Sequence, residues 1–255
     1  MGITKHIPNT ITLLNLLSGV IAIVFFSRHQ LDLAAYMIFL AAVFDFMDGF
    51  SARMLKAYSP LGAQLDSLAD VVSFGVAPSL ILFALIEKSH GLPDVSLGQT
   101  NLLPFFALIV PLFTALRLAK FNIDERQTES FIGLPSPASG LLLASLPLVR
   151  EQLYSSQSLF YMIVTNTYFY LGMALLMSLL MVSELPLFGL KFKSFKLKGN
   201  EIRFFFLIAS LLMIVFLQFV AVPFIVLLYL ILSIIVYLVD IRSEEHTSEL
   251  QSPNT

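Results

Sequence analysis

Long apolar runs without charge, separated by short charged clusters, restrict what this chain can fold into. The longest run, residues 204–239, contains no Asp, Glu, Lys or Arg. A helix needs about 20 apolar residues to cross the hydrocarbon core of a bilayer, so this run offers nearly two crossings. Charged residues are only 13% of the 255 residues, against about 25% in an average soluble domain, and apolar residues are 57%. We therefore expect lipid to cover much of the protein surface.

The runs predict an all-α, polytopic membrane helix bundle of about eight transmembrane helices, forming one domain over residues 1–241. The expected helices cover residues 10–26, 31–51, 64–86, 102–119, 133–149, 160–183, 202–219 and 222–239. Pro223 is expected to break the last run. Residues 242–255 are polar and resemble the translation of a sequencing-library adapter, which indicates a non-native tail. The alternative is a natural, solvated tail.

Loop charges predict the orientation of the bundle. If every expected helix crosses the membrane, all Lys and Arg residues lie on the side of the two termini except Arg28, Lys88 and Arg150. Cytoplasmic loops carry the excess of Lys and Arg, so both termini are expected in the cytoplasm. The net charge of −2 and the lack of a nucleic-acid-binding module indicate no nucleic-acid partner. Without cysteine, the chain has no thiolate nucleophile or zinc–thiolate site.

Four aspartates lie at the ends of two expected helices, where charge is costly. They are Asp45, Asp48, Asp66 and Asp70. Asp45 and Asp48 are three residues apart, and Asp66 and Asp70 are four apart, so the members of each pair lie on one helical face. Carboxylates in spanning segments usually mark a functional site, and a divalent cation would offset their mutual repulsion. All-oxygen ligation suits Mg²⁺, Mn²⁺ or Ca²⁺. The alternative is that the aspartates are solvated carboxylates at helix ends, or that they pair with Arg53 and Lys56.

The aspartates belong to a longer pattern, D-x2-D-G-x2-A-R-x8-G-x3-D-x3-D, from Asp45 to Asp70. This spacing resembles the signature of the CDP-alcohol phosphotransferases, and all eight specified positions match. Gly49 and Gly62 have no Cβ, which would let a nucleotide approach the backbone. Arg53 offers a planar fork of donors that suits a phosphate.

Three further segments narrow the resemblance, which covers roughly residues 7–147. The opening IPNTITLLN resembles family members that use CDP-diacylglycerol. DSLADVVSFGVAP, at residues 66–78, and ALRLAKFN followed by GLPSPA, at residues 115–138, resemble members that use serine. The resemblance implies transfer of the phosphatidyl group from CDP-diacylglycerol to the hydroxyl of L-serine, with release of CMP. It also implies a homodimer surrounded by membrane lipids, in a bacterial inner (cytoplasmic) membrane with the active site facing the cytoplasm.

The resemblance further implies roles for individual residues. The divalent metal, Mg²⁺ or Mn²⁺ and two ions in number, would be held by Asp45, Asp48, Asp66 and Asp70. Asp70 would also take the proton of the serine hydroxyl as general base. Contacts to CDP-diacylglycerol would come from Asn9, Thr12, Gly49, Arg53, Ser59 and Gly62. Contacts to serine would come from Arg117, Asn122 and Ser136.

Several alternatives stay open at this point. Asn9 and Thr12 could cap the first helix instead of binding a nucleotide. Arg117 and its neighbours could serve as a membrane anchor followed by a proline turn. The acceptor could be glycerol 3-phosphate or an inositol phosphate, for which Arg117, Lys120 and Arg126 would supply a basic cluster. A cation channel or transporter could use the aspartates as a relay.

Overall fold

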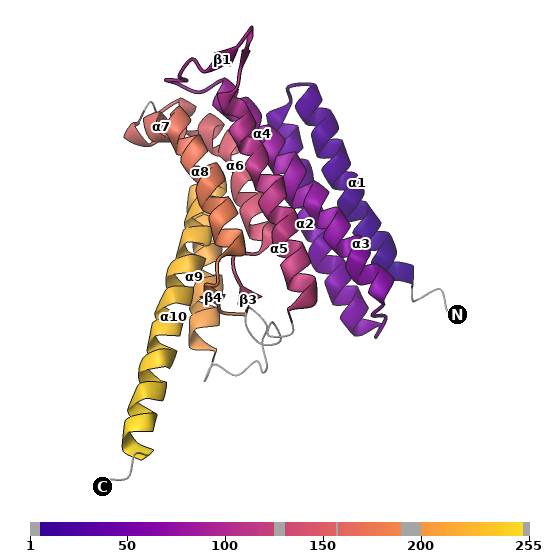
Figure 1. Cartoon of the computed structure of the whole chain (residues 1–255), viewed down its shortest axis with the longest axis vertical. Helices are drawn as coiled ribbons and strands as arrows, with labels where there is room; N and C mark the ends of the chain where they lie inside the picture. The colour runs from indigo at the N-terminus through magenta and orange to yellow at the C-terminus, as the bar shows by residue number, and fades with distance from the viewer. Residues whose placement is uncertain (1–5, 125–130, 157, 190–199, 252–255) are drawn as a thin grey trace.

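A computed structural model shows a bundle of helices that run up and down in alternation (Figure 1). It describes residues 6–124, 131–156, 158–189 and 200–251, with side chains as far as Val239. The helices of the first half are α1 (Ile7–Ser27), α2 (Leu31–Met54), α3 (Pro60–Asp70), the π-helix η2 (Val71–Val76), α4 (Ala77–Glu87), the 3-10 helix η3 (Leu103–Leu108) and α5 (Ile109–Ile123). Those of the second half are α6 (Ser136–Tyr154), α7 (Leu159–Val164), α8 (Thr167–Val182), α9 (Glu201–Leu217), the 3-10 helix η4 (Gln218–Val220) and α10 (Ala221–Gln251).

Two short antiparallel strand pairs lie at the two ends of the bundle (Figure 1). The first pair is β1 (Ser96–Leu97) with β2 (Thr100–Asn101). The second is β3 (Phe131–Ile132) with β4 (Pro186–Leu187), which joins two distant parts of the chain. The start of α1 and the end of α10 lie at the same end of the bundle as β3 and β4 (Figure 1).

Several helices are long and apolar enough to cross a membrane. Within the described residues there are five such stretches: Ile7–Ser27, Leu31–Met54, Pro60–Glu87, Leu103–Ile123 and Glu201–Val239. α8 is also apolar but has only 16 residues. The all-α membrane fold expected from the sequence is confirmed at this level, and the exact set of eight spans stays a prediction.

Most predicted helix ends shift by a few residues, and two of the predicted breaks differ from the structure in position. The expected helix 160–183 is divided into α7 and α8, because the Asn166 side chain accepts the Tyr168 backbone N–H at 2.9 Å and caps α8. The last apolar run breaks at Gln218, where φ is 53°, and not at Pro223. Pro223 lies in the first turn of α10, where its missing N–H costs no helical hydrogen bond.

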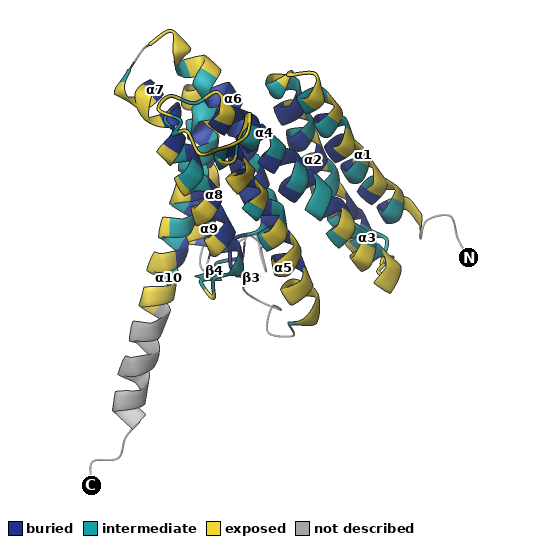
Figure 2. Ribbon diagram, turned by 45° about the horizontal axis from the view of Figure 1, so that its top comes forward, coloured by how far each residue is buried: buried dark blue, intermediate teal, exposed yellow. Residues whose placement is uncertain are grey.

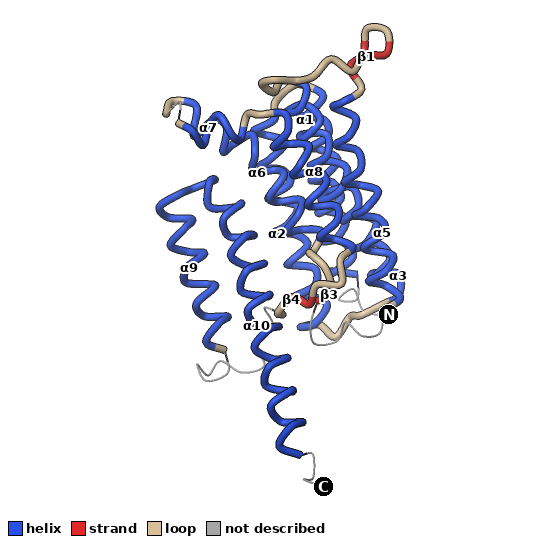
Figure 3. The backbone as a smooth tube through the Cα atoms, turned by 60° about the vertical axis from the view of Figure 1, so that its left-hand side comes forward, coloured by secondary structure: helices blue, strands red, loops and turns tan. Residues whose placement is uncertain are grey.

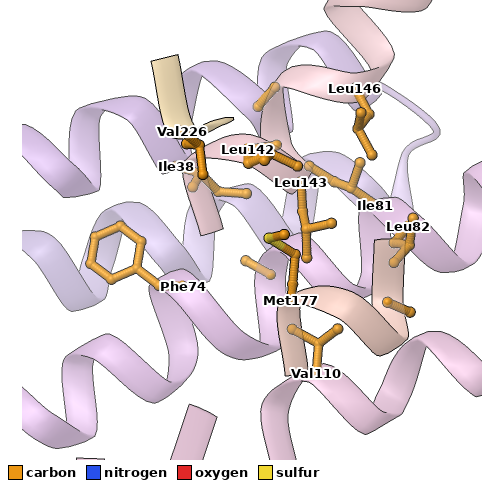
Figure 4. Close-up of a cluster of buried hydrophobic side chains, with 14 of the residues drawn as sticks. Ile38, Phe74, Ile81, Leu82, Val110, Leu142, Leu143, Leu146, Met177 and Val226 are labelled. Carbon is orange, nitrogen blue, oxygen red and sulfur yellow. The ribbon is translucent and has the colours of Figure 1, made fainter. Parts of the chain in front are cut away.

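One hydrophobic core joins helices from the whole length of the chain (Figure 4). It contains side chains of α2, η2, α4, α5, α6, α8 and α10, namely Ile38, Phe74, Ile81, Leu82, Val110, Leu142, Leu143, Leu146, Met177 and Val226. The outward faces of the helices carry exposed apolar residues, such as Leu112 and Phe216 (Figure 2). Such faces suit contact with lipid. α9 and α10 stand beside each other at one edge of the bundle (Figure 3).

Glycines allow the π-helix η2 to fit closely between α1 and α6. A Cβ at Gly19 of α1 would lie 2.9 Å from the Ser73 Cα atom. A Cβ at Gly140 of α6 would lie 2.8 Å from the Phe74 Cβ atom. Small residues of this kind let helix backbones approach in membrane proteins. Because Asp70 directly precedes η2, this packing also fixes the position of Asp70.

Some sequence predictions fall on residues that the structure does not describe. Residues 252–255 of the predicted tail lie outside the described residues, and α10 continues through Gln251 without described side chains. Several of the basic residues used for the orientation also lie outside them: Lys5, Arg126, Lys191, Lys193, Lys196 and Lys198. The non-native tail and the cytoplasmic termini therefore stay predictions.

Candidate functional site

Three of the four predicted metal ligands meet where α2 ends and α3 begins. One carboxylate oxygen from each of Asp45, Asp48 and Asp66 lies within 4.8 Å of the other two. Ser59 shapes the turn between the helices, because its side chain caps α3 and accepts the Gly62 N–H at 3.0 Å. Pro60 then occupies the first turn of α3, which suits a residue without an N–H.

No basic side chain in the described parts of the chain forms an ion pair with the acidic cluster, which consists of Asp45, Asp48 and Asp66. Asp48 Oδ2 and Asp66 Oδ1 are buried without a hydrogen-bond partner among the described residues. Arg53 and Lys56 are exposed, and neither forms an ion pair within 4.0 Å in the part of the chain that is described. The described residues therefore show no pairing of Arg53 or Lys56 with the aspartates. Buried carboxylates without partners are costly, and an oxygen-ligated divalent cation fits the donor set.

Asp70 lies beside the acidic cluster in a buried chain of hydrogen bonds. It is 5% exposed and close enough to Asp45 and Asp66 for their charges to repel. Asn15 Nδ2 donates to Asp70 Oδ1 at 3.3 Å. Ser136 Oγ donates to Asp70 Oδ2 at 3.4 Å and accepts from Arg117 Nη1 at 3.2 Å. Side chains from α1, α5 and α6 thus hold this carboxyl group in place.

A cavity of about 190 Å³ adjoins the acidic cluster and contains Asp48 and Asp66 in its wall. Five of the six residues predicted to bind CDP-diacylglycerol also line it: Asn9, Thr12, Gly49, Ser59 and Gly62. We call this the nucleotide cavity, after the ligand that the sequence predicts for these residues. The structure therefore brings these predicted residues together with two of the predicted metal ligands.

The two motif glycines differ in what their missing Cβ atoms permit. A Cβ at Gly49 would have one neighbour within 4 Å, Arg53 Nη1 at 3.7 Å, so the backbone is open to a ligand. A Cβ at Gly62 would lie 3.0 Å from Asn9 Oδ1 and 3.1 Å from Ser59 Oγ. Gly62 therefore makes room for the protein's own side chains. Arg53 is exposed and lies over Gly49, outside the lining of the nucleotide cavity.

The capping alternative for Asn9 and Thr12 is wrong. α1 begins at Ile7, so both residues lie inside the helix, and its N-cap position is occupied by His6. The Thr12 hydroxyl donates to the Pro8 carbonyl at 3.0 Å. Both residues instead line the nucleotide cavity.

A second cavity, of about 360 Å³, lies beside Arg117. Arg117 is 7% exposed, and its Nε is buried without a hydrogen-bond partner among the described residues. Its guanidinium carbon lies 5.7 Å from the centre of the Phe121 ring. Lys120, Asp124 and Glu184 line the same space. We call it the acceptor cavity, after the ligand that the sequence predicts for Arg117.

The three predicted serine-binding residues are not all at the acceptor cavity. Arg117 lines it, and Ser136 lies behind Arg117, where it connects the guanidinium group with Asp70. Asn122 is exposed and donates to Ser67 Oγ at 2.9 Å, which ties α5 to α3. Asn122 does not line the acceptor cavity.

Sequence reasoning missed two residues of the site. Asn15 is fully buried and bonded to Asp70, and its spacing of three from Thr12 and six from Asn9 on an apolar helix could have indicated a shared polar face. Glu184 reaches the acceptor cavity because β4 pairs with β3, a contact that no local pattern reveals.

The fold and the site define an integral membrane protein in which a candidate oxygen-donor metal site, Asp45, Asp48 and Asp66, adjoins a cavity. The family described as CDP-alcohol phosphatidyltransferase matches residues 5–180, and the chain belongs to this family. The match covers α1 to α8 apart from the last residues of α8, so Glu184, α9 and α10 lie beyond it.

Curated relatives share one name, CDP-diacylglycerol–serine O-phosphatidyltransferase. The protein of that name from Bacillus subtilis is 37% identical over 142 residues, which cover 56% of this chain and 75% of the relative. The protein from Helicobacter pylori (strain J99) is 32% identical over 214 residues, covering 83% of this chain and 81% of the relative. The protein from Methanocaldococcus jannaschii is 36% identical over 180 residues, covering 70% and 72%.

Proposed function

We propose that the protein transfers the phosphatidyl group of CDP-diacylglycerol to the hydroxyl of L-serine, giving phosphatidylserine and CMP. The observation that carries the proposal is the nucleotide cavity, whose wall contains Asp48 and Asp66 beside the residues expected to bind the nucleotide. Each of these two aspartates also has a buried carboxylate oxygen without a hydrogen-bond partner among the described residues. The shared name of the relatives supports the same donor and acceptor.

Asp45, Asp48, Asp66 and Asp70 would hold the divalent metal. When bound, Mg²⁺ or Mn²⁺ supplies positive charge to the pyrophosphate and to the leaving phosphate. Four carboxylates offer enough oxygen ligands for two ions. Arg53 adds a cation at the mouth of the site, because it is exposed and lies over Gly49.

The chemical step is a displacement at phosphorus. The serine hydroxyl oxygen forms a bond to the phosphatidyl phosphorus, the bond from that phosphorus to the CMP oxygen breaks, and the hydroxyl proton passes to Asp70. Asp70 suits this role because hydrogen bonds from Asn15 and Ser136 fix both of its oxygens. A positioned base of this kind contributes about 10²–10⁴-fold to the rate.

Serine recognition rests on Arg117 and Ser136. The buried guanidinium group has a donor, Nε, without a hydrogen-bond partner in the described residues, and the serine carboxylate would accept a charge-assisted hydrogen bond from this group. Ser136 connects that group with Asp70, so a serine held at Arg117 has its hydroxyl near the base. Asn122 contacts Ser67 on another face, and we propose no direct contact between Asn122 and serine.

The membrane setting completes the proposal. The exposed apolar faces of the helices support a surrounding shell of membrane lipids. We propose a bacterial inner membrane with the active site facing the cytoplasm, on the basis of the loop charges. A homodimer formed through the spanning helices is part of the same proposal.

An acceptor assay tests the proposed function. Purified protein in lipid vesicles receives labelled CDP-diacylglycerol and Mg²⁺ or Mn²⁺ with serine, glycerol 3-phosphate or an inositol phosphate. We expect phosphatidylserine and an equal amount of CMP from serine alone, and no product after chelation of the metal. A lipid product from a phosphorylated acceptor alone would contradict the choice of serine. Cation flux into the vesicles without CMP release would favour a channel.

A further inference from the structure

The acceptor cavity carries side chains of both charges. Arg117 and Lys120, from the last turns of α5, provide the positive side. Asp124 and Glu184 provide the negative side. A cavity with both signs suits a small molecule that is itself a zwitterion, because each charge of the ligand then meets an opposite charge.

The positive side has a buried donor that no protein group uses. Arg117 Nε is buried and without a hydrogen-bond partner among the described residues. An unsatisfied buried donor is costly, and a carboxylate bound there would satisfy it with a charge-assisted hydrogen bond. This observation is independent of the acidic residues, and it indicates a bound anionic group.

The negative side is held in place by the backbone around Glu184. The Gly133 N–H donates to the Leu185 carbonyl at 2.9 Å, directly after Glu184. The Leu134 N–H donates to the Leu180 carbonyl, also at 2.9 Å, shortly before it. Gly133 has a φ of 76°, and a Cβ there would lie 2.6 Å from the Met181 carbonyl oxygen. The segment that carries Glu184 is thus fixed beside the cavity.

Glu184 differs from the other acidic residue of the cavity. Glu184 is exposed and has no ion pair within 4.0 Å among the described residues. Asp124 already interacts with other groups of the protein. The carboxylate available to a ligand is therefore that of Glu184.

We propose that Glu184 binds the ammonium group of the amino-acid acceptor while Arg117 binds its carboxylate, which makes Glu184 a specificity-determining residue. The inference rests on the proposed function and deepens it. With the two charged groups held in this way, the hydroxyl is left to point towards Ser136 and Asp70, which Arg117 reaches through bonds of 3.2 and 3.4 Å.

The same carboxylate disfavours the alternative acceptors. Glycerol 3-phosphate and inositol phosphates carry a doubly charged phosphate and no ammonium group. A negative side chain in the acceptor cavity repels such a ligand, which is a common route to specificity. Glu184 therefore favours serine over the phosphorylated acceptors, which the basic cluster around Arg117 alone would not do.

Three variants and two serine analogues test the assignment. Glu184→Gln removes the charge with little change of shape, and Glu184→Asp keeps the charge. Glu151→Gln makes the same chemical change near the other end of α6, in a cavity lined by Lys88 and Arg150. 3-Hydroxypropanoate lacks the ammonium group of serine, and ethanolamine lacks its carboxylate. Both analogues are measured as inhibitors of serine turnover.

Glu184→Gln is expected to raise the KM for serine about 10- to 100-fold, the effect of losing one hydrogen bond between charged groups. The inhibition constant of ethanolamine should rise with it. The inhibition constant of 3-hydroxypropanoate should not rise, because this anion has no ammonium group for Glu184 to bind. The KM for CDP-diacylglycerol should not change. Glu184→Asp should recover part of the loss, and Glu151→Gln should match the wild type.

Two results would overturn the assignment while leaving the proposed function intact. One is that the wild-type protein forms phosphatidylserine and Glu184→Gln has the same KM for serine as the wild type. The other is an equal rise for serine and 3-hydroxypropanoate, which would indicate a general disturbance of the cavity. If the wild-type protein makes no phosphatidylserine, the proposed function itself fails, and the assignment falls with it.

Discussion

Ser136 offers a sharp test of the link between acceptor binding and catalysis. Its hydroxyl is fully buried, accepts from Arg117 Nη1 at 3.2 Å and donates to Asp70 Oδ2 at 3.4 Å. Ser136→Ala removes both hydrogen bonds and adds no bulk. The guanidinium group of Arg117 then loses the acceptor for its Nη1. Its Nε already lacks an acceptor among the described residues.

The size of the effect follows from the two distances. Hydrogen bonds to charged groups contribute about 1.5–3 kcal/mol each. The bond from Arg117 is longer than the most common N–H···O length of about 2.9–3.0 Å, and the bond to Asp70 is longer than the most common O–H···O length of about 2.7–2.8 Å. The lower end of the energy range therefore applies to both. We therefore expect Ser136→Ala to cost about 1.5 kcal/mol for each lost bond. This corresponds to a roughly tenfold higher KM for serine and a roughly tenfold lower kcat.

Ser139 supplies a matched control one helical turn along α6. It is also fully buried, but its Oγ has no hydrogen-bond partner among the described residues. Ser139→Ala removes the same atom without breaking a bond, so its kinetics should match the wild type. The assay is steady-state CMP release from vesicles, with serine and CDP-diacylglycerol varied in turn and thermal unfolding recorded for each variant.

The reasoning would be refuted if Ser136→Ala and Ser139→Ala gave the same kcat and the same KM for serine. A loss confined to the KM for CDP-diacylglycerol would refute it as well, because neither hydrogen bond of Ser136 faces the nucleotide cavity.

Three further variants probe other parts of the site. Asp70→Asn should lower CMP release by about 10²-fold or more while CDP-diacylglycerol still binds, and near-normal turnover would exclude Asp70 as the base. Gly133→Ala should lower the thermal unfolding midpoint at a cost of about 1–3 kcal/mol, because a side chain at φ 76° is strained and its Cβ meets the Met181 carbonyl. An unchanged midpoint would contradict that conformation. Tyr229→Phe should raise the KM for serine a few-fold, since the Tyr229 hydroxyl donates to the Phe188 carbonyl at 3.1 Å and supports β4, and an unchanged KM would count against this support.

The acidic cluster could be predicted because its geometry is largely local. Helical spacing places Asp45 with Asp48, and the short turn from Met54 to Pro60 returns the chain so that Asp66 meets them. The apolar runs predicted most helices for a similar reason, since hydropathy acts over one helix at a time.

The partners of Asp70 and the wall of the acceptor cavity could not be predicted in the same way. Asn15 is 55 residues from Asp70 in sequence, and Ser136 is 66 residues away. These contacts depend on how α1 and α6 pack against η2. Glycines such as Gly140 allow this packing, but a glycine in the sequence does not show which helices will meet there. Glu184 depends on the β3–β4 pairing between distant segments. Asn122 is predicted to bind serine because it lies near Arg117 in sequence. It instead contacts Ser67 and does not line the acceptor cavity.

Metal binding by the purified protein tests the central claim most directly. Mn²⁺ binding, followed by electron paramagnetic resonance in detergent without substrates, should be saturable in the wild type. Asp48→Asn and Asp66→Asn each remove a carboxylate with a buried, unpartnered oxygen, and each should weaken binding at least about tenfold. Glu151→Gln should leave it unchanged. Equal Mn²⁺ binding in the wild type and both aspartate variants would contradict the account, because the acidic cluster would then not be the metal site.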